Sequence, residues 1–565
     1  MRIKFLIIWL CGLFSVFGRA QQIPKIAIIS DAHIQDVMGH PETVRTLQVQ
    51  VQSTRLFNEN IFALKAALDD IARQHISLVL ITGDMTDDGQ LLNQEAAQQI
   101  LDQYERQYGM QFFLTPGNHD PKAPFGMQLK GKDYLQDDGS TLTIVSDPSY
   151  NDPQSKSPVY VDTLMRSAGY QEEIRCYANN GYFPQRKYLY WACPFSDNDY
   201  PHYQYERALS QSQLSNRYRM VAGVRVIDPS YVVEPVKGLW LLSIDPGVYL
   251  PMKGEDGSVA FQNSSVGYNL LLSYKKGLLQ WIRTVAAQAH RYGKTLIAFS
   301  HYPLVDYNDG ATPVIKAAWG SHVFDVDRVP SVAVTDSLLQ AGIRLHFAGH
   351  MHVNDTGIFH DKEGNSLYNI QVPSLATGMP AYKTVQVLPG NRFHIQTILL
   401  DSVPGFNSLF PRYAKEYQYE QQHEGKVIWS KEALKSKNYQ EFCDWQLQDL
   451  TRNRFVPRDL PLLLRDSLLS MQGNGFTGME MITDLYRLYY SSGLARLRIP
   501  ASRLNAYQRY FTRSAHKSLL NFFFIKNTCA MKSFARIFQC FLQGEPDVDF
   551  TIDLNHDTIH DHWTE

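Results

Sequence analysis

Short apolar runs alternate with amphipathic segments along residues 23–400 of this chain. The runs are typical of buried strands and predict strands at residues 25–30, 77–82, 111–115, 239–244, 295–300 and 344–349. Between them, apolar residues recur with helical spacing over residues 61–71 and 278–286, which predicts amphipathic helices. This order of strands and helices indicates an α/β fold class with a largely parallel sheet.

The pattern changes after residue 352. Polar and apolar residues then alternate over residues 366–372, 382–388 and 392–400, and Gly, Pro and Asn turns separate these segments. Such alternation predicts antiparallel strands of a second sheet, with one face buried and the other exposed to water.

Two long segments lie outside this organisation. Residues 122–236 are rich in Tyr, Pro and Asp and interrupt the alternation. An insertion of this size is either a specificity or lid element or a structural subdomain, and both interpretations stay open. Residues 401–565 have a mostly helical pattern, which predicts a separate helical C-terminal domain after a main domain of residues 21–400.

The first twenty residues have a different composition from the rest. Arg2 and Lys4 precede an apolar stretch over residues 5–16, and Gly18 and Ala20 place small residues at the two positions that determine cleavage. This arrangement predicts a secretory signal peptide over residues 1–20, with an uncleaved anchor as the alternative. No later segment approaches the roughly 20 apolar residues of a membrane-spanning helix. We therefore expect an exported protein, periplasmic or extracellular, without a transmembrane segment after cleavage.

Charge and cysteine content narrow the expected partners. The 54 Lys and Arg residues nearly balance the 56 Asp and Glu residues, giving a formal net charge of -2, and no Lys/Arg stripe is evident. A nucleic-acid polymer is therefore not expected as a partner. The six cysteines form no CxxC metal motif, and Cys176 and Cys193 either bridge a loop or remain buried thiols.

Five of the predicted strands are followed by residues that commonly bind metal ions. Parallel strands place their carboxyl ends at one edge of a sheet, where α/β proteins bind their ligands. We therefore expect these side chains to converge on one site. In chain order they are Asp31 with His33, Asp84, Asn118 with His119 and Asp120, His301, and His350 with His352.

The types of these donors indicate which metals the site can hold. Carboxylates, imidazoles and an amide oxygen, without a thiolate, suit Mn, Zn, Fe, Ni or Co, with Mg as a further alternative. Seven donors are more than one tetrahedral or octahedral ion needs if substrate is also to bind. They suit two divalent metal ions that lie about 3.5–4 Å apart and share a bridging carboxylate.

The five blocks follow the pattern DxH, GDxxDxG, GNH[DE], H and GHxH over residues 31–352. In type and order they resemble the calcineurin-like metallophosphoesterase superfamily, and the resemblance extends to about residue 400. It implies an αββα sandwich of two packed sheets with a binuclear metal centre.

The resemblance also implies a role for each residue. The first metal would be held by Asp31, His33, Asp84 and His352. The second would be held by Asp84, Asn118, His301 and His350, so that Asp84 bridges the two ions. His119 would not be a ligand but would donate a proton to the leaving-group oxygen, and Asp120 would orient it.

The activity implied by this arrangement is hydrolysis of a phosphoric ester. Two cations lower the pKa of a bridging water toward neutrality, so that a metal-bridging hydroxide can attack phosphorus. They also neutralise the charge that develops on the phosphoryl oxygens. An alkoxide is a poor leaving group, and a histidine such as His119 is suited to protonate it near pH 7.

Departures from individual branches narrow the substrate class. The second block ends in Asp87-Asp88-Gly89, where Ser/Thr protein phosphatases have Asp-Arg-Gly, and it lacks the metal-binding tyrosine of purple acid phosphatases. Asp87 is expected to be a turn residue or a neighbour of the ligands rather than a ligand. GNHD and GHMH look more like phosphodiesterases of cyclic nucleotides, phospholipids or sphingomyelin. A diester of a small molecule or lipid is therefore preferred, with a phosphomonoesterase such as a nucleotidase, or a non-catalytic scaffold on the same fold, as alternatives.

Other histidines and aromatic residues have a structural interpretation. His346 lies inside a predicted strand, away from its carboxyl end, and is expected to fill the core. Tyr188, Tyr190 and Trp191 could stack on a base or sugar, although packing in the core is the preferred interpretation. The histidines of the acidic segment at residues 555–562 are expected to lie in a solvated tail.

Overall fold

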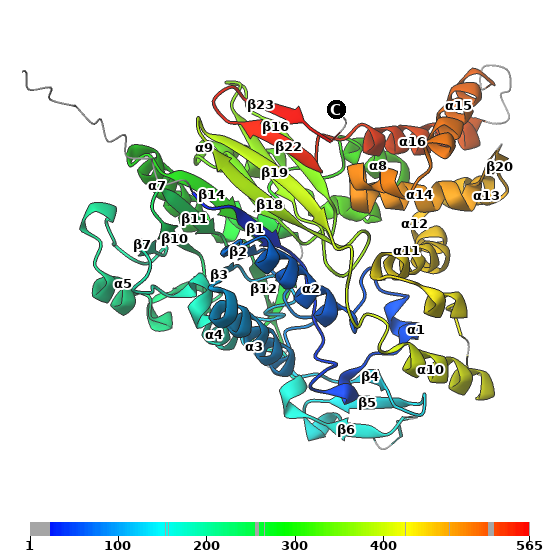
Figure 1. Cartoon of the computed structure of the whole chain (residues 1–565), viewed down its shortest axis with the longest axis horizontal. Coiled ribbons are helices and arrows are strands. Elements are labelled where there is room, and N and C mark those ends of the chain that lie inside the picture. The colour runs from blue at the N-terminus through cyan, green and yellow to red at the C-terminus, as the bar shows by residue number, and fades with distance from the viewer. Residues whose placement is uncertain are drawn as a thin grey trace, which may run out of the picture.

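Two seven-stranded sheets form the body of the molecule, and helices cover their outer faces (Figure 1). The computed structural model describes residues 23–563, apart from residues 153, 156, 255–258, 265, 424, 426, 474 and 518–524. The predicted signal peptide over residues 1–20 lies outside the described residues. Within the described chain, no helix combines the length and the apolar character needed to cross a membrane.

The first sheet contains the first three predicted strands. Its strands are β1 (Ile26–Ile29), β2 (Leu78–Ile81), β3 (Gln111–Leu114), β18 (Ala381–Leu388), β19 (Arg392–Leu399), β22 (Asp549–Asp553) and β23 (Thr558–Asp561). Their order is β23-β22-β19-β18-β1-β2-β3. The neighbours β1, β2 and β3 are parallel, whereas β18 runs antiparallel to β1.

The second sheet contains the other three predicted strands. Its strands are β7 (Tyr190–Ala192), β10 (Tyr231–Val236), β11 (Leu239–Ser243), β14 (Thr295–Phe299), β15 (Leu345–Ala348), β16 (Asp355–His360) and β17 (Ser366–Gln371). Their order is β16-β17-β15-β14-β11-β10-β7, and β11, β14 and β15 are parallel neighbours. All six predicted strands are confirmed, but three belong to each sheet.

Alternating side chains place each sheet between two apolar layers. On β11, Leu239 and Leu241 lie in the core that also contains the residues of β1 and β2, whereas Trp240 and Leu242 pack with helices on the other face. The helices are α2 (Asn60–Arg73) and α3 (Leu91–Tyr108) on the first sheet, and α7 (Lys276–Arg291) and α9 (Val332–Gln340) on the second. The expected αββα sandwich and both predicted helices are confirmed.

The strands after residue 352 are present but are shared between the sheets. Residues 366–371 form β17, which is parallel to β15 in the second sheet. β18 and β19 form a hairpin in the first sheet instead. The prediction of one additional antiparallel sheet is therefore wrong, because β18 pairs with β1 across more than 350 residues and local alternation carries no information on such a partner.

The segment predicted as an insertion over residues 122–236 is partly integrated into the second sheet through β7 and β10. Outside that sheet it forms a small sheet of β4 (Lys132–Leu135), β5 (Thr141–Val145) and β6 (Val159–Val161), the helices α4 (Tyr170–Cys176) and α5 (Tyr205–Gln211), and the hairpin β8 (Tyr218–Val221) and β9 (Val224–Ile227). Two further strands follow, β12 (Val248–Lys253) and β13 (Val259–Ser264). Tyr188, Tyr190 and Trp191 are buried in the core, as preferred from the sequence.

The C-terminal segment is mostly helical, as expected. Its elements are α10 (Phe410–Gln422), α11 (Tyr439–Leu450), α12 (Val456–Asp459), α13 (Leu462–Leu469), the short strands β20 (Gln472–Gly473) and β21 (Phe476–Thr477), α14 (Gly478–Ser491), α15 (Ala501–Lys517) and α16 (Ile525–Leu542). Three shorter helices occur earlier, α1 (Leu47–Gln50), α6 (Leu271–Tyr274) and α8 (Thr312–Trp319). After α16 the chain returns to the first sheet, where β22 pairs with β19.

This return corrects two expectations. The acidic C-terminal segment is not a solvated tail but the hairpin β22–β23, in which His556, His560 and His562 remain exposed. The boundary predicted at residue 400 consequently does not separate the last strands from the first sheet.

Cys176, Cys193, Cys443 and Cys540 are free thiols, so the alternative of a bridge between Cys176 and Cys193 is wrong.

A buried carboxyl group at the start of α2 should make stability depend on pH. Glu59 Oε1 accepts a hydrogen bond from the Tyr413 hydroxyl of α10 at 2.5 Å, whereas Oε2 has no hydrogen-bond partner among the described residues. Burial raises the pKa of Glu59 from 4.5 to about 7. Because the pKa of Glu59 is higher in the folded than in the unfolded protein, protonation of Glu59 stabilises the fold. This contribution to the free energy of unfolding is complete below pH 4.5 and is lost as the pH rises through about 7.

We predict that Glu59→Gln reduces the fall in unfolding free energy between pH 4.5 and 8 by up to about 3 kcal/mol, because the amide does not ionise. Urea unfolding of the wild type and the variant at several pH values measures this difference. Glu42→Gln is the control, since the Glu42 side chain is 39% exposed. An unchanged pH dependence in Glu59→Gln would show that Glu59 does not titrate as proposed.

Candidate metal centre

The seven candidate ligands come from the carboxyl ends of strands in both sheets. Four follow β1, β2 and β3 of the first sheet, and three follow β14 and β15 of the second. The two edges meet, because the backbone N–H of His350 donates hydrogen bonds to both carboxylate oxygens of Asp31, at 3.2 and 3.0 Å. The predicted convergence at one edge is therefore confirmed for two sheets rather than one.

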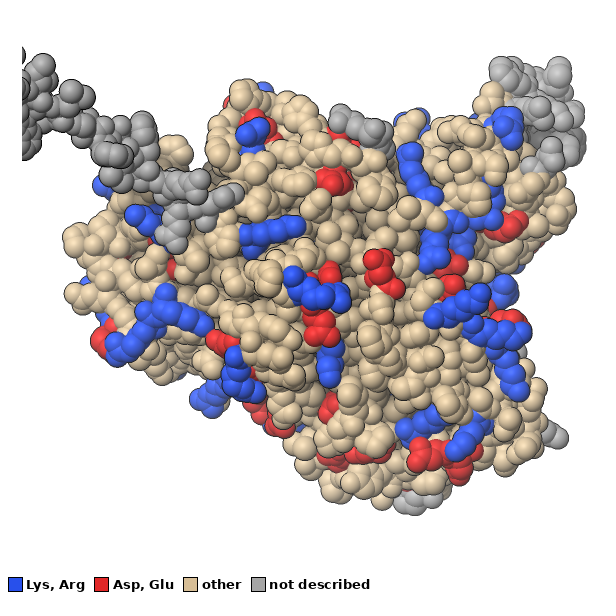
Figure 2. All heavy atoms as spheres, viewed as in Figure 1, with Lys and Arg blue, Asp and Glu red and all other residues tan. Residues whose placement is uncertain are grey.

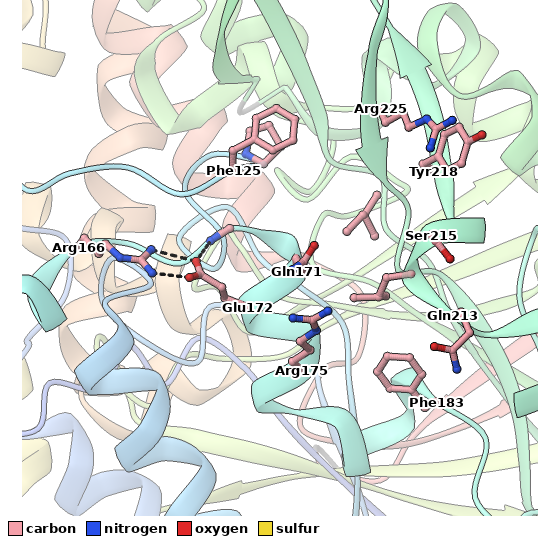
Figure 3. A pocket seen from close by; sticks show the side chains of 14 residues that line it. Phe125, Arg166, Gln171, Glu172, Arg175, Phe183, Gln213, Ser215, Tyr218 and Arg225 are labelled. Atoms are coloured by element: carbon pink, nitrogen blue, oxygen red, sulfur yellow. Dashed lines mark hydrogen bonds and ion pairs between the residues drawn. The ribbon is translucent and has the colours of Figure 1, made fainter. Parts of the chain in front are cut away.

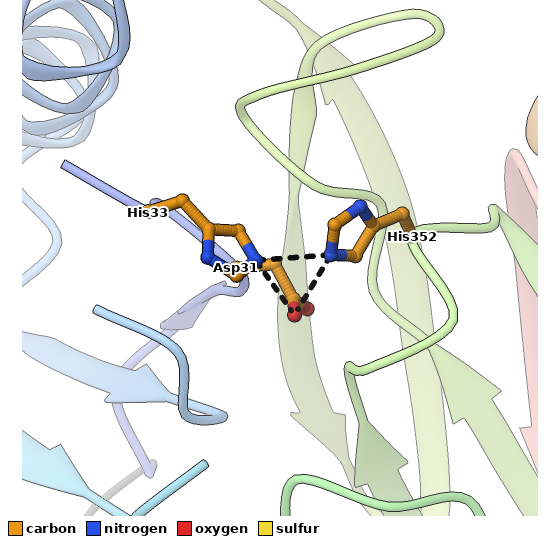
Figure 4. A group of neighbouring side chains, drawn as sticks. All are labelled: Asp31, His33 and His352. Carbon is orange, nitrogen blue, oxygen red and sulfur yellow. Dashed lines mark hydrogen bonds and ion pairs between the residues drawn. The ribbon is translucent and has the colours of Figure 1, made fainter. Parts of the chain in front are cut away.

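Asp31, His33 and His352 form the first group of side chains (Figure 4). The Nε2 atoms of His33 and His352 are 3.0 Å apart, and they lie 3.7 and 3.3 Å from Asp31 Oδ1. Figure 4 shows both rings pointing toward this carboxylate from opposite sides. All three side chains are buried, so the group can offer three ligand atoms to one ion without competition from bulk water.

Asp84, His301 and His350 form the second group. His301 Nε2 lies 3.3 Å from Asp84 Oδ2, 3.1 Å from His350 Nδ1 and 2.9 Å from Asn118 Oδ1. Asp84 Oδ2 also lies 3.6 Å from His33 Nε2 in the first group. The carboxylate of Asp84 is thus placed between the two groups, where a bridging ligand has to be.

The backbone at these ligands adopts conformations that are rare for residues other than glycine. Positive φ angles occur at Asp31 (49°), His33 (45°), Asp84 (49°), His350 (70°) and His352 (57°). Left-handed backbone at such residues costs on the order of 1–3 kcal/mol each and persists where the surrounding structure enforces it. Five of the seven candidate ligands are held in this way, which supports a functional arrangement of their side chains.

Two glycines allow the loops to approach closely enough. A Cβ atom on Gly117 would lie 2.0 Å from Asp84 Oδ1, and a Cβ atom on Gly349 would lie 2.3 Å from Asp31 Oδ2. Neither position tolerates a side chain without displacing a candidate ligand. The glycines of the GNHD and GHMH blocks therefore have a steric role beside the ligands.

The electrostatics of the site suit cation binding. Burial alone would raise the pKa of Asp84, but the imidazoles of His301, His119 and His33 hold it below its usual range. Burial, together with Arg55, lowers the pKa of His33 to about 3. Anionic carboxylates and neutral imidazoles are the forms that bind metals, so the residues present fit two divalent ions. His301 is the exception: burial lowers its pKa, but Asp84 and Asp31 outweigh this effect and raise it to about 9, so a metal ion bound there would have to displace this proton.

His119 lies beside the two groups without belonging to the predicted ligands. Its ring makes an edge contact with that of His33, with the centroids 5.0 Å apart, and its backbone N–H donates to Asp84 Oδ1 at 2.8 Å. The side chain is 20% exposed, so a substrate can reach it. This position is suited to a proton donor at the open side of the site.

The prediction that Asp120 orients the ring of His119 is wrong. The carboxylate of Asp120 accepts hydrogen bonds from the backbone N–H of Thr86, at 3.2 and 3.3 Å, and from the Thr86 hydroxyl. Asp88 Oδ1 instead lies 3.1 Å from His119 Nδ1. Asp88 also binds Lys122 at 2.8 Å and contacts Lys132, which hold its carboxylate in place. Asp88 therefore orients the ring, while Asp120 supports the preceding loop.

Asp87 has the supporting position expected from the sequence. Its Oδ1 accepts a hydrogen bond from Arg55 at 2.8 Å, and Lys132 and Arg45 lie 3.5 and 4.0 Å from Oδ2. His33, Asp87 and His119 also lie close enough together to form a third group of possible ligands. Three cationic partners nevertheless occupy the Asp87 carboxylate, which favours the supporting role.

Two arginines beside the site had no signal in the sequence. Arg55 Nη2 lies 3.4 Å from His119 Nδ1, and Arg328 Nη1 lies 3.4 Å from His350 Nε2. Neither follows a strand in one of the five blocks, so spacing could not identify them. His346, in contrast, is fully buried and contacts Ser300 and Asn369 at 2.9 and 2.8 Å, which confirms its structural interpretation.

One family model and several solved structures are similar to this chain. The family model described as calcineurin-like phosphoesterase matches residues 24–194, which include Asp31, His33, Asp84 and Asn118. No curated protein matches the chain. A dimetal phosphatase from Danio rerio is 12% identical with a TM-score of 0.30, and the match covers 67% of this chain and 97% of that one. A purple acid phosphatase from yellow lupin (Lupinus luteus) seeds is 9% identical with a TM-score of 0.35, covering 67% and 52%.

Proposed function

We infer that this chain, a metal-dependent phosphoric ester hydrolase of the calcineurin-like phosphoesterase family, is exported and hydrolyses a phosphodiester. The observation that carries the metal-dependent hydrolysis in this proposal is the position of Asp84 between the two groups of buried ligands. One shared carboxylate between two groups of imidazoles is what a pair of divalent ions requires. When bound, these ions would supply Lewis-acid activation of water and of the phosphoryl group.

The side chains around the ions would protonate the leaving group and orient the substrate. His119 would give a proton to the leaving alkoxide, and Asp88 would keep the ring turned toward the substrate. Arg55 and Arg328 approach the site from the side of His119 and from the side of His350, respectively. Guanidinium groups in these positions would attract a phosphoryl anion and help to orient it.

The preference for a diester rests on the GNHD and GHMH blocks, which look like those of phosphodiesterases. The preference for a small molecule or lipid, rather than a nucleic-acid polymer, agrees with the surface charges. On the face shown in Figure 2, Lys and Arg residues are scattered among Asp and Glu residues without a continuous basic stripe. Export rests on the signal-like composition of residues 1–20.

We predict that metal-stripped protein regains activity with Mn, Zn or Mg, and that kcat/KM is higher for bis(p-nitrophenyl) phosphate than for p-nitrophenyl phosphate. Both esters release the same chromophore, so the comparison isolates the charge and second substituent of the phosphate. A higher kcat/KM for the monoester would favour the nucleotidase-like alternative instead. Activity on neither ester with any of these metals would favour the non-catalytic scaffold.

Export has its own test, because mass spectrometry of the secreted protein should show cleavage after residue 20.

A further inference from the structure

A large groove lies within the segment predicted as an insertion. Its volume is about 810 Å³, and small-molecule sites typically measure roughly 300–1,000 Å³. Every residue that lines it belongs to residues 124–227, which supply the loop after β3, the helix α4 and the hairpin β8–β9. Neither His119 nor any of the seven candidate ligands lines it. The groove is therefore distinct from the candidate metal centre.

The charge of the groove is positive and only partly compensated. Glu172 Oε2 accepts hydrogen bonds from Arg166 Nη1 at 3.0 Å and from the backbone N–H of Gly169 at 3.1 Å, so this carboxylate is already engaged (Figure 3). Arg175 and Arg225, which also line the groove, have no carboxylate partner among the residues that the structure describes. Both guanidinium groups are consequently free to bind an anion.

Aromatic rings lie beside these arginines. Phe125 is 60% exposed, although its ring makes an edge contact with Phe261 at a centroid distance of 5.7 Å. Tyr218 carries the Arg225 guanidinium 4.3 Å above its ring, and Phe183 contributes a further apolar surface. Figure 3 shows Arg175 on α4 and Arg225 beside Tyr218 on a different segment of the groove. Charged forks and apolar ring faces therefore occur together in one groove.

The wall of the groove is firmly attached to the loops of the metal centre. The Ser167 hydroxyl donates to the backbone carbonyl of Asp88 at 2.5 Å, and the Ala168 N–H donates to that of Gly89 at 2.7 Å. The Tyr170 N–H donates to the Pro124 carbonyl at 3.1 Å. These bonds hold the side of the groove formed by the loop after β3 and the start of α4 in place before any ligand arrives, which lowers the cost of binding.

We propose that this groove binds an organic anion in which a phosphate or carboxylate group is joined to an aromatic or apolar group. Either Arg175 or Arg225, which lie in different parts of the groove, would bind the anionic group, because guanidinium forks match the geometry of phosphate and carboxylate oxygens. Phe125, Phe183 and Tyr218 would cover the apolar part. The ligand is either a free small molecule or the head region of an anionic lipid, and both offer this chemistry.

The test uses the full-length protein with its metals removed by a chelator, so that binding is measured without turnover. 1-Naphthyl phosphate serves as the soluble probe, and its fluorescence reports binding. We expect saturable binding to the wild type that weakens by at least about tenfold in Arg175→Gln/Arg225→Gln, because the charge-assisted hydrogen bonds are lost. Arg186→Gln/Arg207→Gln is the matched control, since both arginines lie in the same segment but outside the groove.

Vesicles of phosphatidylcholine with and without phosphatidic acid distinguish the two sources of ligand. Binding of naphthyl phosphate or of the anionic vesicles that is lost in Arg175→Gln/Arg225→Gln and kept in the control supports the groove, and the probe that binds identifies the source. The proposal is overturned if neither probe binds, or if both double variants bind as the wild type does. Ester hydrolysis by the metal-loaded Arg175→Gln/Arg225→Gln variant is assayed in parallel, so that failure of the groove and failure of the proposed function remain distinguishable.

Discussion

Replacing Asp84 by asparagine is expected to remove most ester hydrolysis and to lower the bound metal from two ions to one or none. Asp84 Oδ2 lies 3.6 Å from His33 Nε2 and 3.3 Å from His301 Nε2, so one neutral amide would weaken both candidate sites. We expect kcat/KM to fall by at least about a hundredfold, since even residues that only support a metal ligand are worth roughly 10–100-fold. Metal analysis and ester assays on the same preparation measure both effects.

Asp120→Asn is the matched control for metal content. Asp120 is also buried beside the site, but its carboxylate binds the backbone and hydroxyl of Thr86. It should therefore keep both metal ions. Two metal ions and full activity in Asp84→Asn would contradict a bridging role for Asp84.

Replacing His119 by alanine is expected to lower turnover by about 10²–10⁴-fold while metal content stays unchanged, as for the loss of a general acid. His119 lies beside the candidate ligands, its ring is held by Asp88 and its side chain is 20% exposed. The loss should be smaller for an ester with a weakly basic leaving group, such as 2,4-dinitrophenol, because that group departs without a proton. A merely structural role would not produce this dependence on the leaving group.

His290→Ala is the control, because it also removes one imidazole, from an exposed position on α7. It should hydrolyse both kinds of ester as the wild type does. If His119→Ala instead loses metal in proportion to activity, His119 is a ligand, and the group formed by His33, Asp87 and His119 would have to be reconsidered as a metal site.

The candidate ligands could be predicted because each follows directly on a strand. A buried apolar run fixes where a parallel strand ends, and the next residues must lie at the edge of the sheet. Asp31, His301 and His350 are placed in this way even though they belong to different sheets. The distinction between His346 and His350 follows from the same rule, since one lies within β15 and the other lies beyond it.

Contacts between distant loops could not be predicted in this way. That Asp88, rather than Asp120, meets the ring of His119 depends on how two loops pack, and both carboxylates fit the local sequence equally well. The pairing of β22 with β19 joins residues more than 150 positions apart, and the short alternating segment at the C-terminus does not specify a partner. The groove similarly requires α4 and the hairpin β8–β9 to face each other, which no local pattern encodes.

The most direct test of the binuclear centre is a crystal structure of the protein reconstituted with Mn, with anomalous scattering used to locate the metal. The geometry predicts two anomalous peaks about 3.5–4 Å apart, as in other two-metal sites. One peak should lie against Asp31, His33 and His352, the other against Asn118, His301 and His350, with the carboxylate of Asp84 contacting both. A single peak, or two peaks without Asp84 between them, would contradict a binuclear centre built on this carboxylate.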